Sequence, residues 1–260
     1  LCGGVPVVIE TKEENEFRLT ADELREKITD KTKLLVLPYP NNPTGAIMRR
    51  EDLEAIAKVL KDTNIMIASD EIYSELTYSG KHCSIAEIEG MRERTIVING
   101  FSKSFAMTGW RLGFLGGPKE IVSQMLKLHQ YAIMSSPTVS QYAAIVAMHS
   151  CQKDIDAMRN EYNIRRRFVV DSFNKLGLKC FAPQGAFYVF PCIKSTGMTS
   201  TDFCEKLVYT KKVAVVPGDA FGECGEGYVR VSYAYSLNHL REAIKRIGEF
   251  LEDIKNGNVQ

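Results

Sequence analysis

The residues best suited to chemistry lie between positions 102 and 111. Lys103 has a serine on each side, Ser102 and Ser104, and follows the apolar β-branched run 96–98, which is typical of a buried strand. A lysine just past a buried strand can be partly desolvated, which favours its neutral, nucleophilic amine. Arg111 and the neighbouring hydroxyls offer a fixed cation and short donors, which suit a phosphate. A loop with a solvated lysine would fit the same stretch equally well.

A nucleophilic lysine near phosphate ligands suggests pyridoxal 5'-phosphate (PLP), a cofactor that proteins hold through a Schiff base to lysine. Asp70 ends a second apolar run and could supply the anion that PLP needs against its pyridine nitrogen. Tyr73 can reach the same side if a helical turn starts there, so that its hydroxyl donates to the phenolate oxygen of the cofactor. A helix N-cap and a core aromatic residue are the alternative interpretations of Asp70 and Tyr73.

Two other polar residues have unusual surroundings. Arg230 lies inside the apolar run 228–232, where a charge must be solvated or paired, and a bidentate grip on a substrate carboxylate would account for it. An edge strand with this arginine facing water would account for it as well. Asn42 lies among turn-forming residues at 41–45, so it is either part of a simple turn or a second donor to the phenolate oxygen.

Apolar runs alternate with amphipathic segments over the first 150 residues, which predicts an α/β domain with a mostly parallel sheet. The expected strands are 5–9, 33–37, 64–69, 95–99 and 112–116, and the expected helices are 24–28, 49–60 and 121–131. Ligands of such sheets bind outside the carboxyl ends of the strands. Asn42, Asp70 and Lys103 each follow an expected strand, and we therefore expect them to meet at one edge of the sheet.

The pattern changes after about residue 150. A long charged helix is expected at 154–176, followed by short strands at 186–190, 213–216 and 228–232 and by helices at 200–209 and 237–254. This order predicts a large domain at 1–150 and a smaller α+β domain at 151–260, linked by the long helix.

Composition excludes several other classes of protein. The chain has 33 basic and 32 acidic residues, for a net charge of +1, which gives no support for nucleic acid or a membrane surface as the main partner. No apolar run approaches the roughly 20 residues of a membrane span. The seven cysteines include no C-x-x-C pair, which favours a reduced, cytoplasmic protein, and the four histidines lack metal-ligand spacing.

Together these motifs resemble the class I/II aminotransferases, PLP enzymes of fold type I. The resemblance covers nearly the whole chain and rests on four segments: Asn42-Pro43-Thr44-Gly45, Asp70-Glu71-Ile72-Tyr73, Ser102-Lys103 with Gly109-Trp110-Arg111, and Tyr228-Val229-Arg230-Val231-Ser232. More narrowly, segments 73–78, 96–100 and 128–131 resemble the branch that contains the bacterial N-acetyl-diaminopimelate and aromatic aminotransferases.

The resemblance implies a role for each residue. Lys103 would form the Schiff base with PLP and carry the proton between the substrate α-carbon and the cofactor. Asp70 would pair with the pyridine nitrogen, and Tyr73 and Asn42 would bond the phenolate oxygen. Ser102 and Arg111 would bind the phosphate, and Arg230 would bind the substrate carboxylate. The implied reaction is ping-pong exchange of an amino group between an amino acid and a 2-oxo acid, in a homodimer of the full-length protein.

Two departures from the family pattern lead to further expectations. Gly100 stands where many members carry a serine that donates to the phosphate, so phosphate binding would depend more on Arg111. The family also has an N-terminal portion, before the position of Leu1, that completes the cofactor site, and we expect this chain to bind PLP poorly without it. The alternatives to an aminotransferase are a PLP-dependent carbon–sulfur lyase on the same scaffold and a non-catalytic fragment.

Overall fold

The computed structural model describes residues 3–258, which form two compact units. Unit 1 takes in residues 3–40 and Ala46–Ala157, and unit 2 takes in Asn41–Gly45 and residues 158–258. The short segment Asn41–Gly45 therefore groups with the second unit, although its neighbours in the sequence belong to the first.

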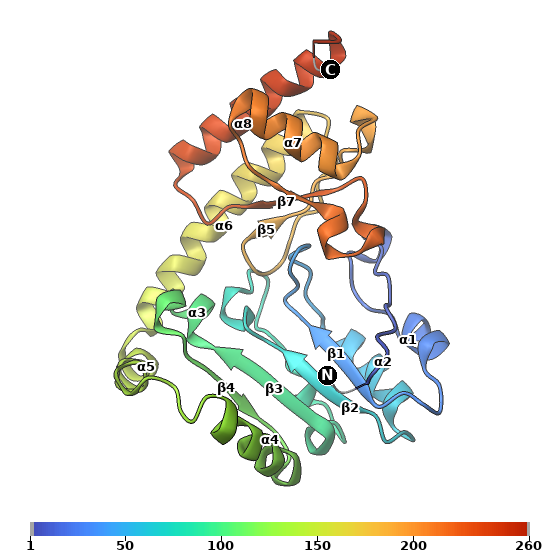
Figure 1. Ribbon diagram of the computed structural model, residues 1–260, viewed down its shortest axis with the longest axis vertical. Coiled ribbons are helices and arrows are strands. Elements are labelled where there is room, and N and C mark those ends of the chain that lie inside the picture. Colours follow the sequence, from blue (N-terminus) through green and yellow to red (C-terminus); the bar gives the residue numbers. More distant parts are fainter. Residues whose placement is uncertain (1–2, 259–260) are drawn as a thin grey trace. The chain divides into compact units, whose positions relative to one another are not determined.

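Unit 1 is built on a four-stranded sheet in the order β1-β2-β3-β4, whose strands lie side by side in Figure 1. The strands are β1 (Leu34–Pro38), β2 (Met66–Asp70), β3 (Thr95–Gly100) and β4 (Gly113–Gly116). β1, β2 and β3 are parallel, and β4 runs antiparallel to β3. The mostly parallel α/β sheet expected from the sequence is confirmed.

The prediction of a strand at 5–9 is wrong. Residues 3–12 form no strand, and Val5, Val7 and Val8 are 86%, 64% and 66% exposed. A β-branched run becomes a strand only where a neighbour can pair with its backbone. Within residues 3–258, this run is paired with no other strand.

Unit 1 also contains helices, the first of which begins with a recognisable capping signal. They are α1 (Ala21–Lys27), α2 (Arg50–Leu60), α3 (Phe101–Ser104), α4 (Lys119–Ala132) and α5 (Thr138–Ser150). Thr20 caps α1, because its hydroxyl accepts from the Glu23 amide at 3.2 Å while the Glu23 carboxylate accepts from the Thr20 amide at 2.9 Å. α5 was not expected from the sequence, because its apolar residues follow no single face.

Both β1 and α2 contribute buried side chains to the core of unit 1. Leu53, Ile56 and Leu60 of α2 are buried, as are Leu35 and Leu37 of β1. Burial alternates along β1, so that Leu34 and Val36 on its other face are about half exposed in the described structure. The apolar run at 33–37 predicts a buried strand, and the structure buries one face of it.

Unit 2 combines a small antiparallel sheet with three helices. The sheet has the order β5-β7-β6, with β5 (Tyr188–Val189), β6 (Val216–Pro217) and β7 (Val229–Ser232). The helices are α6 (Gln152–Lys175), which begins in unit 1, α7 (Ser200–Lys211) and α8 (Leu237–Lys255). Phe203 of α7 and Phe250 of α8 pack edge to face, with ring centroids 5.2 Å apart.

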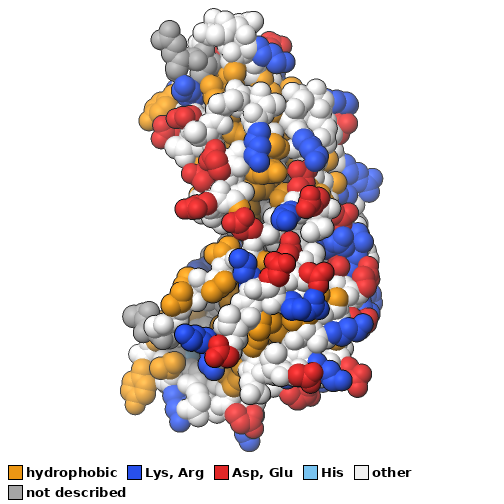
Figure 2. Space-filling model, turned by 90° about the vertical axis from the view of Figure 1, so that its right-hand side faces the viewer, with side chains coloured by type: hydrophobic (Ala, Val, Ile, Leu, Met, Phe, Trp, Pro, Cys, Tyr) orange, Lys and Arg blue, Asp and Glu red, His pale blue; other side chains and the backbone are white. Residues whose placement is uncertain are grey.

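The surface of the chain carries both signs of charge. On the face shown in Figure 2, basic and acidic side chains are interspersed, in keeping with the net charge of +1. No helix in the described part of the chain combines the length and the apolar character that a membrane crossing requires.

Candidate active site

The turn that carries Asp70 and Tyr73 leaves the carboxyl end of β2. Asp70 pairs with Ile98 of β3, and its Oδ1 accepts from the Ile72 amide at 3.2 Å. This bond closes an Asx-turn, whereas a helix N-cap was the alternative expectation. Tyr73 is 6% exposed and precedes the 3-10 turn η2 (Ser74–Leu76). The sequence therefore brings a carboxylate and a buried phenol to one short turn at a strand end.

Lys103 lies just beyond the neighbouring strand. β3 ends at Gly100, and Lys103 is a half-buried residue of the short helix α3 that follows at once. α3 packs beside η2, and the Asn99 amide Nδ2 donates to Ser74 Oγ at 3.0 Å. Because β2 and β3 are parallel neighbours, their carboxyl ends bring Lys103 and the Asp70–Tyr73 turn to the same edge of the sheet.

Arg111 is held on a loop that depends on α5. Its backbone is left-handed, with φ of 52°, its side chain is exposed, and its Nη1 donates to the Thr108 carbonyl at 2.9 Å. Ser140 of α5 donates from Oγ to the Trp110 carbonyl at 2.7 Å. A hydrophobic cluster that joins α3, the loop and α5 fixes the same region, and its buried members are Phe101, Met107, Ala144 and Ala147.

Gly100 stands where a phosphate-binding serine was considered, and the structure gives a packing reason for glycine. A Cβ at this position would lie 3.1 Å from the Gly113 Cα and 3.1 Å from the Leu112 carbonyl oxygen. These contacts are tighter than normal and involve backbone, which cannot yield easily. The hydroxyls near Lys103 therefore come from Ser102, which is half-buried, and from Ser104, which is buried with its Oγ lacking a partner among the described residues.

Asn42 and Arg230 form the second group of candidate residues, and both belong to unit 2. Arg230 donates from Nη1 to Asn42 Oδ1 at 2.9 Å. Its guanidinium carbon lies 4.6 Å from the ring centre of Tyr188 and 4.9 Å from that of Phe221. β7 is the central strand of its sheet, so the edge-strand interpretation of Arg230 is wrong. The Nε atom is buried and has no partner within the described residues.

Sequence reasoning did not find Tyr188 and Phe221. Phe221 belongs to a short 3-10 segment, Gly218–Phe221, in a stretch that the sequence presents simply as a turn. Tyr188 is buried in β5 and resembles any core aromatic residue. Their common feature is contact with the Arg230 guanidinium, which only the folded chain reveals.

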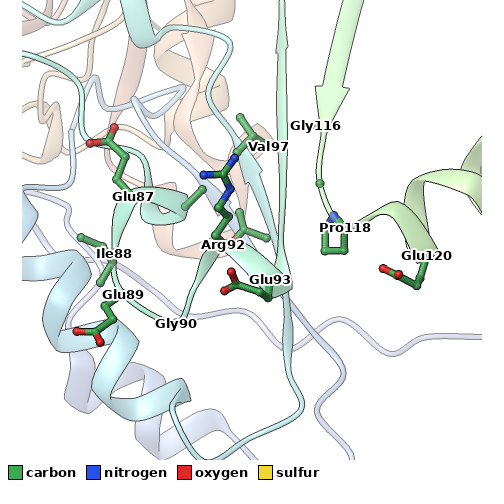
Figure 3. A pocket seen from close by; sticks show the side chains of 13 residues that line it. Glu87, Ile88, Glu89, Gly90, Arg92, Glu93, Val97, Gly116, Pro118 and Glu120 are labelled. Atoms are coloured by element: carbon green, nitrogen blue, oxygen red, sulfur yellow. The ribbon is translucent and has the colours of Figure 1, made fainter.

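A pocket of about 1010 Å³ lies elsewhere in unit 1 (Figure 3). It is lined by residues near the start of β3 and the end of β4, among them Thr95, Val97 and Gly116. Lys103 follows the opposite end of β3. The charged lining residues are Glu87, Glu89, Arg92, Glu93 and Glu120, which include no nucleophilic amine or thiol. This pocket is therefore not part of the candidate active site.

Comparisons with known proteins agree with these features. The family model described as aminotransferase class I and II matches residues 1–247. An aspartate aminotransferase of Pyrococcus abyssi is 48% identical over 98% of this chain and 66% of its own length. A probable N-acetyl-LL-diaminopimelate aminotransferase of Bacillus subtilis is 48% identical over 96% of this chain and 63% of its own length.

Solved structures give the same result for the fold. An aromatic aminotransferase from Pyrococcus horikoshii matches with a TM-score of 0.95 and 47% identity, over 97% of this chain and 69% of that one. Fold type I and the expected branch of relatives are thereby confirmed. The chain spans about two thirds of the length of the curated relatives that it matches. The chain belongs to the class I and II aminotransferase family.

Proposed function

We propose that this chain carries most of the active site of a PLP-dependent aminotransferase, which moves an amino group between an amino acid and a 2-oxo acid by a ping-pong mechanism. The observation that carries the proposal is the placement of Lys103 beside the Asp70–Tyr73 turn at the carboxyl ends of two neighbouring parallel strands. Ligands of open α/β sheets bind at this edge, and members of the family use PLP.

The chemistry of the donors fits PLP. Asp70 offers an anion for the pyridine nitrogen, and Tyr73 and Asn42 offer donors for the phenolate oxygen. Arg111, with Ser102, offers a cation and a hydroxyl for the phosphate. The buried Ser104 Oγ, which has no partner among the described residues, leaves one more hydroxyl near Lys103. When bound, PLP supplies an electron sink for the substrate α-carbon.

Two residues of the chain would act on the substrate. The Lys103 amine would bond to the cofactor and carry the proton to and from the substrate α-carbon. Arg230 would bind the substrate carboxylate, because its Nη1 is engaged by Asn42 while its buried Nε still lacks an acceptor. A carboxylate on the Nε side would satisfy this donor with a charge-assisted hydrogen bond.

Addition of PLP to the purified full-length protein tests the proposal. Lys103→Ala should abolish the visible absorbance of bound cofactor, and Lys81→Ala, which changes an exposed lysine, should leave it intact. Incubation with single amino acids and no 2-oxo acid should leave pyridoxamine 5'-phosphate on the protein. Release of ammonia and pyruvate would instead identify a carbon–sulfur lyase, and absence of cofactor absorbance would contradict both enzymes.

We further propose that unit 1 is the large PLP-binding domain, that unit 2 is the small domain, and that the full-length protein is a cytoplasmic homodimer. Exposed apolar side chains on and after α4 and on α5 support an association surface, among them Tyr131, Met134 and Tyr142, which are 94%, 80% and 70% exposed. Light scattering on the full-length protein should give twice the mass of one chain. A monomer at micromolar concentration would contradict this arrangement.

A further inference from the structure

Glu71 is a buried carboxylate for which the proposed reaction has no use. It follows Asp70 directly, and only 4% of its surface is exposed. Successive side chains at a strand end point to opposite sides. Glu71 therefore shares the interior side with the buried Ser69, away from Asp70. A carboxylate in such a place is costly unless donors surround it.

Three side chains supply those donors. Ser84 and Ser69 donate from their hydroxyls to Glu71 Oε1 at 2.6 and 2.8 Å, and His82 Nε2 lies 2.8 Å from Oε2. The two oxygens are thus engaged from two separate segments, the strand end at Ser69 and the loop at 82–84. Burial raises the pKa of Glu71, but the hydrogen bonds from His82, Ser84 and Ser69 outweigh it and hold this pKa below its usual value. With Glu71 ionised, His82 is the donor through Nε2–H.

The backbone of Glu71 belongs to the turn that carries the candidate cofactor ligands. Its amide donates to the Ile98 carbonyl of β3 at 2.8 Å, and its carbonyl accepts from the Ser74 amide at 2.9 Å. The side chain of Glu71, the second residue of the Asp70–Tyr73 turn, therefore binds the turn to the loop at 82–84, while its backbone binds the turn to the strand that leads to Lys103.

We propose that Glu71, with His82 and Ser84, is a positioning residue that sets the turn on which Asp70 and Tyr73 are presented to the cofactor. This inference rests on the proposed function for the part that concerns PLP. The fixation of the turn itself concerns the chain alone, so the two parts can be tested separately.

Amide hydrogen exchange on the protein without cofactor tests the fixation. Glu71→Ala should accelerate exchange at Ile72, Ser74 and Leu76 at least about tenfold relative to the core amide of Ile67. Glu71→Gln should keep exchange slow, because the glutamine side-chain carbonyl can accept from His82 and its side-chain amide NH2 can donate to both serine hydroxyls. Glu89→Ala changes an exposed glutamate and should have no effect.

The pH dependence of the visible absorbance of bound PLP provides the second measurement. Tyr73 would donate to the phenolate oxygen, and Asp70 would keep a proton on the pyridine nitrogen. The hydrogen bond and the positive ring would both favour the unprotonated form of the Lys103 nitrogen when it is bonded to the cofactor. Displacement of Tyr73 or Asp70 should therefore raise the midpoint, by about one pH unit in Glu71→Ala. Glu71→Gln should keep the wild-type midpoint. If Glu71 contributed only to stability, Glu71→Ala would lower the melting temperature and leave the midpoint of the absorbance titration unchanged.

The outcomes separate the two proposals. Two results for Glu71→Ala would overturn the role of Glu71. One is equal acceleration of exchange at all amides, and the other is unchanged exchange at the turn amides with an unchanged midpoint of the absorbance titration. A full-length wild-type protein without visible absorbance would count against the proposed function, and the exchange experiment would then decide the role of Glu71 by itself. Local acceleration at the turn together with a raised midpoint would support both.

Discussion

Arg230 donates from Nη1 to Asn42 Oδ1 at 2.9 Å, although 188 residues separate them in the sequence. This bond acts together with two aromatic rings, because the ring centres of Tyr188 and Phe221 lie within 5 Å of the guanidinium carbon. The three contacts hold the guanidinium in one orientation. A planar guanidinium with one end engaged and its Nε still without an acceptor is well placed to take a carboxylate.

Replacement of Arg230 by lysine should therefore impair the binding of the substrate. An ammonium keeps the charge but loses the planar fork, which is worth roughly 1.5–3 kcal/mol for a charged hydrogen bond. We expect kcat/KM for the amino acid to fall about 10- to 100-fold, mainly through KM. Steady-state kinetics with Arg230→Lys measures this, and Arg241→Lys is the control at an exposed arginine of the same unit. An unchanged KM would contradict the carboxylate role.

Ser140 should affect the cofactor through the loop that it holds. Ser140→Ala removes the 2.7 Å bond from this buried hydroxyl to the carbonyl of the exposed Trp110. We expect a loss of about 1–2 kcal/mol in the free energy of unfolding and several-fold weaker PLP binding, because the loop carries Arg111. Ser123→Ala removes a comparable bond to a backbone carbonyl on an exposed helix and should change neither. Urea unfolding and PLP titration give both quantities.

Gly45 should be more sensitive to substitution than a glycine with the same backbone conformation in open space. Its φ is +71°, and a Cβ there would lie 2.3 Å from the Pro183 Cβ and 2.9 Å from the Gly185 carbonyl oxygen. Gly45→Ala should therefore cost roughly 2–4 kcal/mol, from overpacking and left-handed backbone together. Gly177, with φ of +82° and no neighbour within 4 Å, should lose only about 1 kcal/mol as alanine. Equal losses on urea unfolding would contradict the steric account.

The stability that Glu71 contributes should depend on pH. The folded-state pKa of this carboxyl is lowered from 4.5, so its contribution is complete above the unfolded value and is lost as pH falls through the folded value. The difference in unfolding free energy between wild type and Glu71→Gln should thus shrink from about pH 7 to about pH 3. The corresponding difference for the exposed Glu89→Gln should stay flat. A constant difference for Glu71→Gln would show that its ionisation is not linked to folding.

Much of the sheet and its helices could be predicted because their signals are local. Leu53, Ile56 and Leu60 recur at helical spacing, and β1 to β4 follow apolar runs bounded by turn residues. α5 was missed since its sequence is apolar on all sides and has no polar face to set a period. The strand predicted at 5–9 is absent because an apolar run forms a strand only beside another strand that pairs with it, and composition does not reveal such a partner.

Some residues of the candidate site could likewise be predicted from the sequence, and others could not. Asp70, Tyr73 and Lys103 could be grouped from the sequence, because each follows a strand and parallel strands end at one edge. The partners of Arg230 could not, because Tyr188, Phe221 and Asn42 reach it from three separate segments that share no spacing pattern with it. Nor did the sequence show that Glu71 is buried among His82, Ser84 and Ser69, since a glutamate beside an aspartate looks like a solvated pair.

The membership of Asn41–Gly45 in unit 2 limits how the molecule can be divided. The Gly45 carbonyl accepts from the amides of Gln184 and Gly185, both at 2.9 Å. A protein expressed from Met158 onward would leave these two amides without their acceptor and Arg230 without Asn42. During synthesis, residues 41–45 leave the ribosome more than a hundred residues before the rest of unit 2. Unit 2 therefore finishes folding only when this pentapeptide, which lies between two parts of unit 1 in the sequence, packs against it.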